Sequence, residues 1–485
     1  MDISNKIKQI FPDLAMYKSG NRDNLFGGRN LPSFVKDYIV KRFSDSAGVI
    51  DREAVKDYLD TKMNNDGGQI RQRLLRGDKV NLTCRIVVQS DLKAGKTAFN
   101  IADVDLQSDA YILPSVIDSH LDDLIDGENW GNITLEYFKP QGSKKEGYVN
   151  MTSFRPFRPY SVDYDYFLKA RTQFSLEEWM DVLISAMEYN PDSLLLKNEE
   201  ESIMRKHEFL SRLLIAVEPR LNMIELGPKG TGKSWIYSNL SKWIWLVGNG
   251  GITRARMFYN RSSRQFGVMK THDAVIIDEA ATLVIKDDEL RSLLKVFLES
   301  GRVGIDNVNF QSDCGFGLEG NIGLTAELQP IDKDYWRSLP TFFRDSATLD
   351  RFHVFIEGWK LPRLGIGSIV DGWSLNTEYI SEIFHTMRFK PEYAGIFEDI
   401  VSYDLSSDLR DLKAVKKIAT AYAKLLFPHI TDFHKLTADE QMEYKNLYEK
   451  YCLAPAIKKR SIIREQCHLL DKEYQTEMPV FNIIP

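Results

Sequence analysis

The chain has 485 residues, of which 43% are hydrophobic and 27% charged, and its formal net charge is -6. Its length suggests about two to four domains, and its composition is typical of a folded protein, which argues against wholesale disorder. The acidic balance argues against a surface coated in positive potential but allows a local basic channel. With no apolar run of about 18 residues and no signal-like start, we expect a cytoplasmic protein with no membrane partner.

The N-terminal part changes from a helical to a strand-like pattern. Residues 1–75 show apolar spacing typical of helices, which predicts an N-terminal helical region. The pattern that follows predicts strands at 82–88, 97–104 and 110–113, a helix at 115–125, and strands at 132–138 and 148–154. That order matches an OB-fold, although many unrelated small α+β units share it. We therefore expect a β-rich, OB-like domain over 76–160, which ends in the proline-rich segment 155–159.

The central part, residues 161–369, alternates between strand-like and helical segments. Such alternation predicts a parallel sheet with crossover helices. Residues 370–485 are mostly helical in pattern. The fold class expected is therefore multidomain α/β, with a parallel-sheet core, a β-rich N-terminal domain and a helical C-terminal segment.

A phosphate-binding motif follows the apolar segment 221–226. Its residues are Gly227, Pro228, Lys229, Gly230, Thr231, Gly232, Lys233 and Ser234, with a helical pattern over 235–245. Glycines let consecutive backbone N–H groups point at a β-phosphate, and the helix N-terminus adds partial positive charge. Lys233 would reach the β- and γ-phosphates, and the Ser234 hydroxyl would bind Mg²⁺. The sequence therefore predicts ATP and Mg²⁺ as cofactors, and a glycine turn without a ligand is the alternative.

Two acids follow the apolar segment 273–277. Asp278 would stand beside the Mg²⁺ as its second protein ligand, and Glu279 would polarise the water that attacks the γ-phosphate. The pair therefore indicates hydrolysis, although taken alone it also fits the start of a solvated loop. Asn321 ends another apolar segment, 314–320, where its amide could hold that water. An asparagine in a turn is the alternative there.

The chain resembles the Lon-protease-like BrxL proteins of BREX anti-phage systems, whose ATPase core is similar to that of MCM helicases. The resemblance extends from about residue 80 to 466 and is strongest in segments 174–181, 224–234, 258–260 and 349–359. It implies an AAA+ ATPase core over 161–369 and a helical lid over 370–485. It also implies a homo-oligomeric ring, either a hexamer or a heptamer, and two such rings could stack. Other defence-system proteins are the partners that it implies.

The same resemblance gives roles to two arginines. Arg351 would be the arginine finger, donated to the nucleotide of the neighbouring protomer, with Arg344 as its rival. Arg410, at the start of the amphipathic segment 408–426, resembles the sensor-2 arginine of AAA+ lids and would reach the γ-phosphate. The alternatives are an Arg351 paired with a surface acid and a solvated Arg410.

Basic and aromatic residues alternate over 253–264. The DNA-binding candidates are Arg254, Arg256, Arg261, Arg264 and Arg302, which would contact phosphates rather than bases. The resemblance favours double-stranded DNA as the partner and translocation or remodelling as the output. A charged, solvated face is the alternative for these arginines.

Two other functions remain open. One is a protein unfoldase that grips polypeptide with Phe258 and Tyr259, and the other is a DNA-binding scaffold that uses ATP only for assembly. Full-length relatives carry a Lon-type protease domain with a serine–lysine dyad after the lid, whereas this sequence ends at Pro485. Protease activity is therefore not expected.

Overall fold

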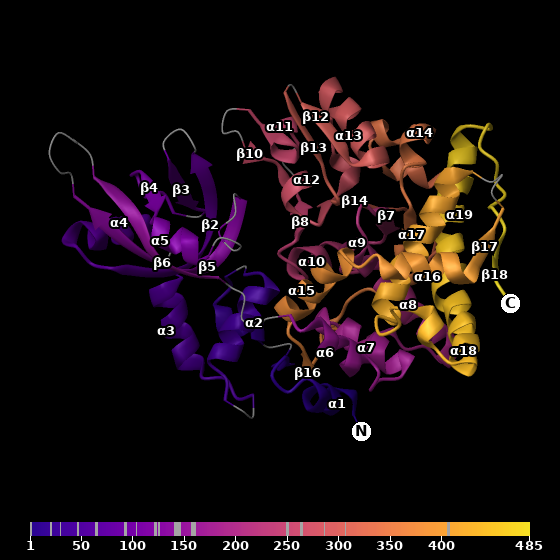
Figure 1. Ribbon diagram of the computed structural model, residues 1–485, viewed down its shortest axis with the longest axis horizontal. Helices are drawn as coiled ribbons and strands as arrows, with labels where there is room; N and C mark the ends of the chain where they lie inside the picture. Colours follow the sequence, from indigo (N-terminus) through magenta and orange to yellow (C-terminus); the bar gives the residue numbers. More distant parts are fainter. Residues whose placement is uncertain are drawn as a thin grey trace. The chain divides into compact units, whose positions relative to one another are not determined.

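The computed structural model of the chain divides into two compact units (Figure 1). The larger unit comprises Met1–Gly20, Val162–Tyr259 and Gly267–Pro485, and the smaller unit comprises Asn21–Ser161 and Asn260–Phe266. The residues that the structure describes are 2–19, 22–29, 31–45, 48–63, 66–91, 95–102, 104–120, 124, 127–139, 147–156, 162–248, 252–261, 265–285, 287–305, 307–404 and 408–485.

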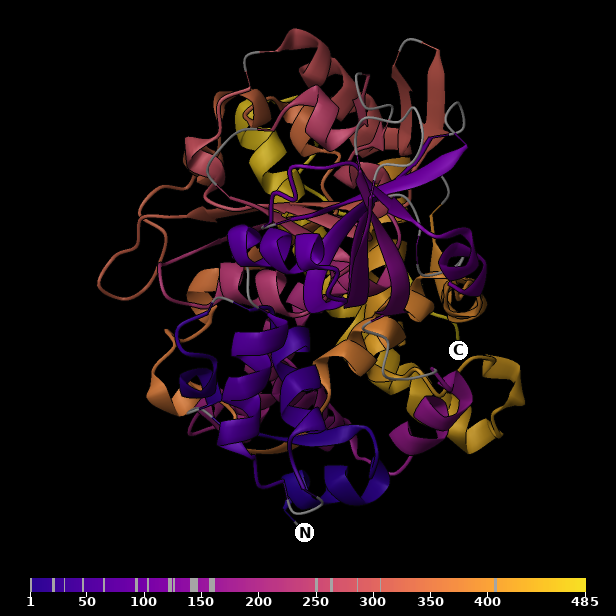
Figure 2. The ribbon, with the colours of Figure 1, turned by 90° about the vertical axis from the view of Figure 1, so that its left-hand side faces the viewer.

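The smaller unit is a closed five-stranded barrel, with α-helices before its first strand and another between its third and fourth strands. Its helices are α2 (Ser33–Arg42), α3 (Arg52–Lys62), α4 (Gly67–Arg76) and α5 (Pro114–Ser119). Its strands are β2 (Val80–Asp91), β3 (Lys96–Ile101), β4 (Ala110–Ile112), β5 (Gly127–Phe138) and β6 (Tyr148–Pro156), in the barrel order β2-β3-β4-β6-β5. Figure 2 draws these strands in purple. Among the barrel strands that the structure describes, β4 and β6 pair in parallel and the other neighbouring pairs are antiparallel. Inward-facing residues such as Phe99 and Leu135 form its core.

The centre of the larger unit is a five-stranded sheet. Its strands are β7 (Asn222–Gly227), β8 (Ile244–Val247), β11 (Ala274–Ile277), β14 (Gly315–Asn321) and β15 (Val354–Glu357), in the order β15-β7-β14-β11-β8. All neighbouring pairs are parallel, which confirms the mixed α/β class with a parallel sheet. β7 and β11 are fully buried, so their sequences are almost continuously apolar.

Helices and short strands surround this sheet. The helices before the C-terminal segment are α1 (Ile3–Ile10), α6 (Tyr164–Arg171), α7 (Leu176–Ala186), α8 (Glu199–Leu210), α9 (Leu214–Val217), α10 (Lys233–Asn239), α11 (Arg254–Met257), α12 (Val268–Thr271), α13 (Asp288–Ser300) and α14 (Ser346–Leu349). The short strands of this unit are β1 (Ala15–Lys18), β12 (Arg302–Ile305), β13 (Val308–Gln311), β16 (Gly372–Leu375), β17 (Val401–Tyr403) and β18 (Phe481–Ile483). The division between the units falls within β9 (Tyr259–Asn260), and β10 (Gln265–Phe266) belongs to the smaller unit.

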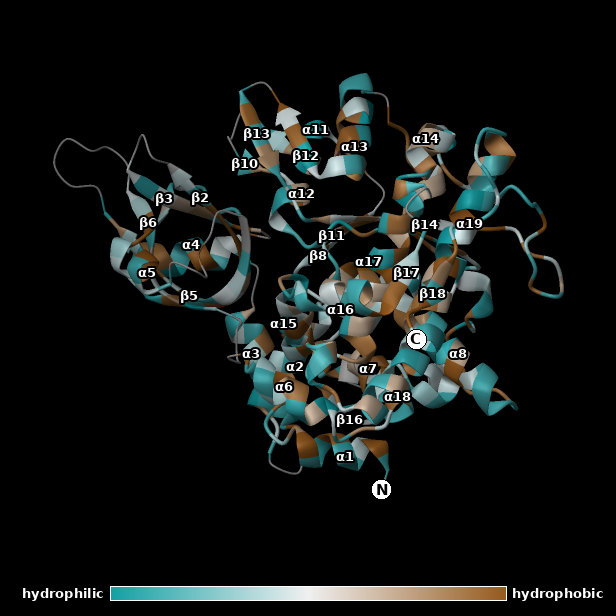
Figure 3. Ribbon diagram, turned by 45° about the vertical axis from the view of Figure 1, so that its right-hand side comes forward, coloured by the Kyte–Doolittle hydropathy of each residue, from teal (hydrophilic) through white to brown (hydrophobic). Residues whose placement is uncertain are grey.

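The C-terminal segment is mainly helical. It contains α15 (Thr377–Arg388), α16 (Glu392–Ile400), α17 (Leu409–Leu426), α18 (Ala438–Tyr448) and α19 (Ala454–Leu470). Every residue of α17 from Ile418 to Leu426 is buried, whereas α18 buries Tyr444 and Tyr448 and is coloured mainly as hydrophilic in Figure 3. No helix in the described part of the chain has both the length and the apolar character needed to cross a membrane.

Two local predictions were wrong. Residues 15–18 were expected to be helical but form β1, which pairs antiparallel with β16. The helix predicted over 235–245 ends at Asn239, and residues from Ile244 form β8 beside β11. In both cases the pairing partner lies far away in sequence, and a short apolar run fits a helix or a strand equally well.

Candidate nucleotide site

The loop between β7 and α10 turns its carbonyl groups toward the protein. Thr231 O accepts from Arg212 Nη1 at 3.1 Å, Gly232 O from the Tyr189 hydroxyl at 3.2 Å, and Gly230 O from Leu364 N at 2.8 Å. In a trans peptide unit the N–H points away from the C=O. The N–H groups of Thr231, Gly232 and Lys233 therefore point away from these protein donors, to the side where an anion can accept from them.

Two loop glycines stand where a side chain would not fit. Gly232 has a φ of 76°, and a Cβ there would collide with the Tyr189 hydroxyl and lie 2.6 Å from the Leu364 side chain. A Cβ on Gly227 would lie 2.9 Å from the backbone of Gly358. Glycine is thus required by close packing around the loop as well as by its conformation.

Lys233 is folded back on the loop. Its Nζ donates to Gly227 O at 3.3 Å and to Pro228 O at 3.0 Å, and its side chain is buried. Burial lowers the pKa of Lys233 from its ordinary value, against the opposing effect of Glu225 and Glu319. The ammonium group is therefore held at the loop by weak acceptors that phosphate oxygens would replace.

A hydroxyl and a carboxylate meet beside this lysine. Ser234 Oγ donates to Asp278 Oδ1 at 2.9 Å, and the same oxygen accepts from Glu279 N at 2.8 Å. Ser234 lies in the first turn of α10 and Asp278 follows β11, so these two elements bring them together. A hydroxyl next to a carboxylate fits the few protein oxygens that Mg²⁺ accepts.

Glu279 and Asn321 complete the cavity wall from two strands. Glu279 has a left-handed backbone conformation, with a φ of 47°, and its side chain is exposed. Asn321 ends β14 and is in register with Gly227, the last residue of β7. Both therefore stand at the same edge of the sheet as the loop.

These residues line one cavity of about 300 Å³. Its lining residues are Lys229, Gly230, Thr231, Gly232, Lys233, Ser234, Trp235, Asp278, Glu279, Glu319, Gly320 and Asn321. Loop amides and an ammonium group for phosphate oxygens, with a hydroxyl and a carboxylate for a hard cation, fit a nucleotide with Mg²⁺. The sequence analysis missed Trp235, Glu319 and Gly320. The signal for Glu319 was a single acid inside an otherwise apolar strand.

Behind the loop lies a buried ion pair that the sequence analysis also missed. Arg212 donates to Glu225 from Nε at 3.0 Å and from Nη2 at 2.6 Å, and both side chains are fully buried. Since Arg212 also binds Thr231 O, the pair connects β7 to the phosphate loop. Its sequence signal was an acid within the apolar strand β7.

Arg351, the candidate arginine finger, and Arg410, the candidate sensor-2 arginine, lie elsewhere in the larger unit. Arg351 Nε contacts Glu299 Oε2 at 3.0 Å, and Arg410 contacts the same atom at 3.2 Å and Asp350 Oδ2 at 2.6 Å. Neither arginine lines the cavity. His353 N donates to Asn222 O, so this cluster stands at the end of the sheet where β7 begins, opposite the loop.

Arg344, the rival candidate, is bound to its own backbone segment. Its Nε donates to Leu339 O at 2.8 Å and its Nη2 donates to Arg337 O at 2.8 Å. Two of its donor groups are therefore already occupied within the protomer.

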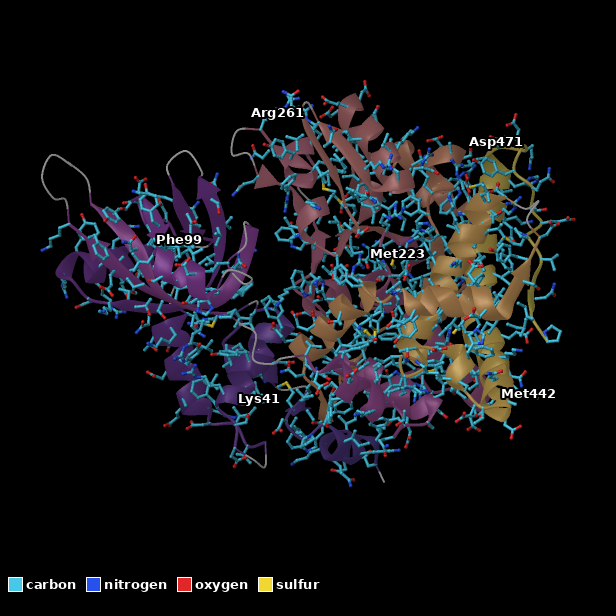
Figure 4. All side chains as sticks on the ribbon, viewed as in Figure 1. Lys41, Phe99, Met223, Arg261, Met442 and Asp471 are labelled. Atoms are coloured by element: carbon cyan, nitrogen blue, oxygen red, sulfur yellow. The ribbon has the colours of Figure 1, made fainter. Side chains whose placement is uncertain are left out.

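The basic candidates differ in their surroundings. Arg254 pairs with Glu289, Arg256 lies over the Trp245 ring at 5.8 Å, and Arg302 is exposed at the start of β12. Arg261 is exposed and labelled in Figure 4, whereas Arg264 lies outside the described residues. Phe258 is fully buried, and its ring centroid lies 5.8 Å from that of Phe297, so it is not available to grip a polypeptide.

Comparison with known proteins identifies the family. The model described as "Lon-like protease BrxL-like, ATPase domain" matches residues 149–480, and the model for "BREX system Lon protease-like protein BrxL N-terminal" matches residues 9–137. The chain belongs to the BrxL family. The resemblance inferred from the sequence is thereby confirmed, and a BrxL ATPase domain contains the cavity.

Two curated BrxL proteins are similar over most of this chain. "Lon-like protease BrxL" of Escherichia coli O9:H4 (strain HS) is 26% identical over 471 residues, which cover 96% of this chain and 64% of the relative. "Lon-like protease BrxL" of Bacillus cereus (strain H3081.97) is 28% identical over 434 residues, which cover 86% of this chain and 61% of the relative. The chain thus spans less than two thirds of the length of either BrxL relative.

Proposed function

We propose that this BrxL-family chain is an AAA+ ATPase that hydrolyses ATP with Mg²⁺ at the cavity described above. The observation that carries the proposal is the meeting of loop amides, Lys233, the Ser234–Asp278 pair and Glu279 around one space. A phosphate loop and two acids at the ends of neighbouring parallel strands are the parts that nucleotide hydrolysis needs.

Each of these residues has a separate task. Lys233 exchanges its carbonyl acceptors for the β- and γ-phosphates, and Ser234 and Asp278 hold Mg²⁺, which neutralises phosphate charge when bound. Glu279 takes up the proton of the attacking water, and Asn321 orients that water. Glu279 is an exposed residue that lines the cavity, which supports this role.

Arg351 and Arg410 act on the nucleotide of a neighbouring copy in a homo-oligomeric ring, a hexamer or heptamer. Their separation from the loop of their own protomer supports this part of the proposal, since they stand where β7 begins and the loop stands where it ends. Glu299 holds both guanidinium groups. A guanidinium on the transferred phosphoryl group would make turnover depend on assembly.

The ring encircles double-stranded DNA and translocates on it or remodels it, in BREX-type defence with other proteins of that system. The BREX description of the matching N-terminal family model supports the setting. The five-stranded barrel, which is OB-like in its element order, and the exposed Arg302 and Arg261 support contact with nucleic acid. The helical segment after β15 is the lid. A protein unfoldase is less well supported because Phe258 is buried.

The test is the rate of ATP hydrolysis with and without duplex DNA at two salt concentrations. We expect DNA to increase the rate and the increase to fall at high salt, because phosphate contacts release counterions. The double variant Arg261→Ala/Arg302→Ala should keep the DNA-free rate and lose most of the increase. If duplex DNA does not change the rate of ATP hydrolysis at either salt concentration, the DNA part of the proposal is wrong, whereas the ATPase part is not contradicted.

A further inference from the structure

Glu319 is a buried acid on the wall of the nucleotide cavity. It lies on β14 with a side chain that is 1% exposed, and it is in register with Glu225 on the neighbouring strand β7. It lines the cavity together with Lys233, Asp278 and Asn321. Neither of its carboxyl oxygens has a hydrogen-bond partner in the described part of the chain.

The charged groups around Glu319 are already engaged. Arg212 is paired with Glu225, Lys233 donates to two loop carbonyls, and Asp278 accepts from Ser234. Burial, followed by the charges of Glu225 and Asp278, raises the pKa of Glu319 well above its ordinary value, and Arg212 and Lys233 oppose this shift only in part. Because neither carboxyl oxygen accepts a hydrogen bond from the described residues, nothing compensates a charge on Glu319, and the folded protein favours its protonated form, which has one O–H donor.

An unsatisfied donor in this position indicates a ligand. Buried polar groups in proteins are almost always hydrogen-bonded, and the other side chains of β14 that face the sheet core are apolar. Glu319 stands two residues before Asn321 on the same strand, so it is on the cavity side where the γ-phosphate is expected. An ionised carboxylate there would repel phosphate oxygens, whereas an O–H group would donate to one.

We propose that Glu319, as an uncharged acid, donates a hydrogen bond to the terminal phosphate of bound ATP and so distinguishes ATP from ADP. The inference rests on the proposed nucleotide site and adds a phosphate contact to it. When the γ-phosphate leaves, the donor loses its acceptor, and the affinity for the diphosphate contains no contribution from Glu319.

The test is equilibrium binding of Mg²⁺-ATP and Mg²⁺-ADP to the full chain by calorimetry. The Glu279→Gln variant serves as the background so that ATP is not consumed. On it, Glu319→Gln keeps an N–H donor at nearly the same position, and Glu319→Ala removes the donor. We expect Glu319→Gln to bind ATP within about threefold of the background, and Glu319→Ala to bind it at least about tenfold more weakly, as one lost hydrogen bond predicts. The affinity for ADP should be the same in all three proteins.

The outcomes separate this inference from the proposed function. Equal loss of ATP affinity in Glu319→Gln and Glu319→Ala would show that an ionised carboxylate is needed and would overturn the inference. Equal loss of ATP and ADP affinity in Glu319→Ala would reveal a structural role and would also overturn it. So would an Ala variant that binds both nucleotides like the background. If the parent chain binds neither nucleotide, the proposed site itself fails.

Discussion

At the level of single residues, the candidate nucleotide site depends on a few side chains and loop amides that meet around one cavity. The sequence motifs predict one site that contains Gly230, Gly232, Lys233, Asp278 and Glu279, and these residues line one cavity, whereas Gly227 does not. Glu319 and Arg212 were missed because their importance depends on burial and on partners far away in sequence. The binding role of each residue remains a prediction.

Glu319 should also affect how stability depends on pH. Its folded-state pKa is raised above its ordinary value of 4.5, so the folded state keeps a proton that the unfolded chain releases. Its contribution to stability is therefore greatest below about pH 4.5 and decreases as pH rises. We expect Glu319→Gln to melt at a higher temperature than the parent at pH 7.5, with a smaller difference at pH 5, in scans without nucleotide. The same difference in melting temperature between the variant and the parent at both pH values would contradict this prediction.

At the scale of elements, burial explains what was predictable. β7, β11 and β14 lie in the centre of a parallel sheet, so their apolar runs ending in polar residues indicated both the strands and the cavity edge. The pairing of β1 with β16 and the closure of the barrel by β2 and β5 were not predictable. The hydrophobic pattern of a segment indicates whether it forms a helix or a strand. Which strand it pairs with depends on how segments that are distant in sequence pack together.

The Arg212–Glu225 pair makes one element-scale prediction. Glu225→Gln leaves Arg212 charged and unpaired in a buried position, which should destabilise the fold by about 3–5 kcal/mol. Because Arg212 also holds Thr231 O, nucleotide affinity should fall as well. Denaturant unfolding measures the first effect. Glu177→Gln is a matched control, since Glu177 is 40% exposed and its partner Lys206 keeps Asp181 at 2.7 Å. A Glu225→Gln variant as stable as this control would contradict the account.

At the level of the whole molecule, the proposed ring requires that one copy complete the nucleotide site of the next. The Arg351→Ala variant has an intact cavity but lacks the arginine. The Lys233→Ala variant has a defective cavity but an intact Arg351. Each variant alone should lose hydrolysis by about 10³-fold or more, but a mixture of the two should recover part of it because some sites combine an intact cavity with an intact arginine. Arg344→Ala is the control, and we expect it to retain turnover. A mixture no more active than its components would contradict action between copies.

The central claim is that the cavity binds and hydrolyses ATP, and the most direct test is nucleotide retention measured together with phosphate release. We expect Glu279→Gln to retain Mg²⁺-ATP while hydrolysis falls by at least about 10²-fold, because the group that accepts the water proton is gone. Lys233→Ala should retain no nucleotide. If both variants bind and hydrolyse ATP like the parent chain, the site lies elsewhere and the account is wrong.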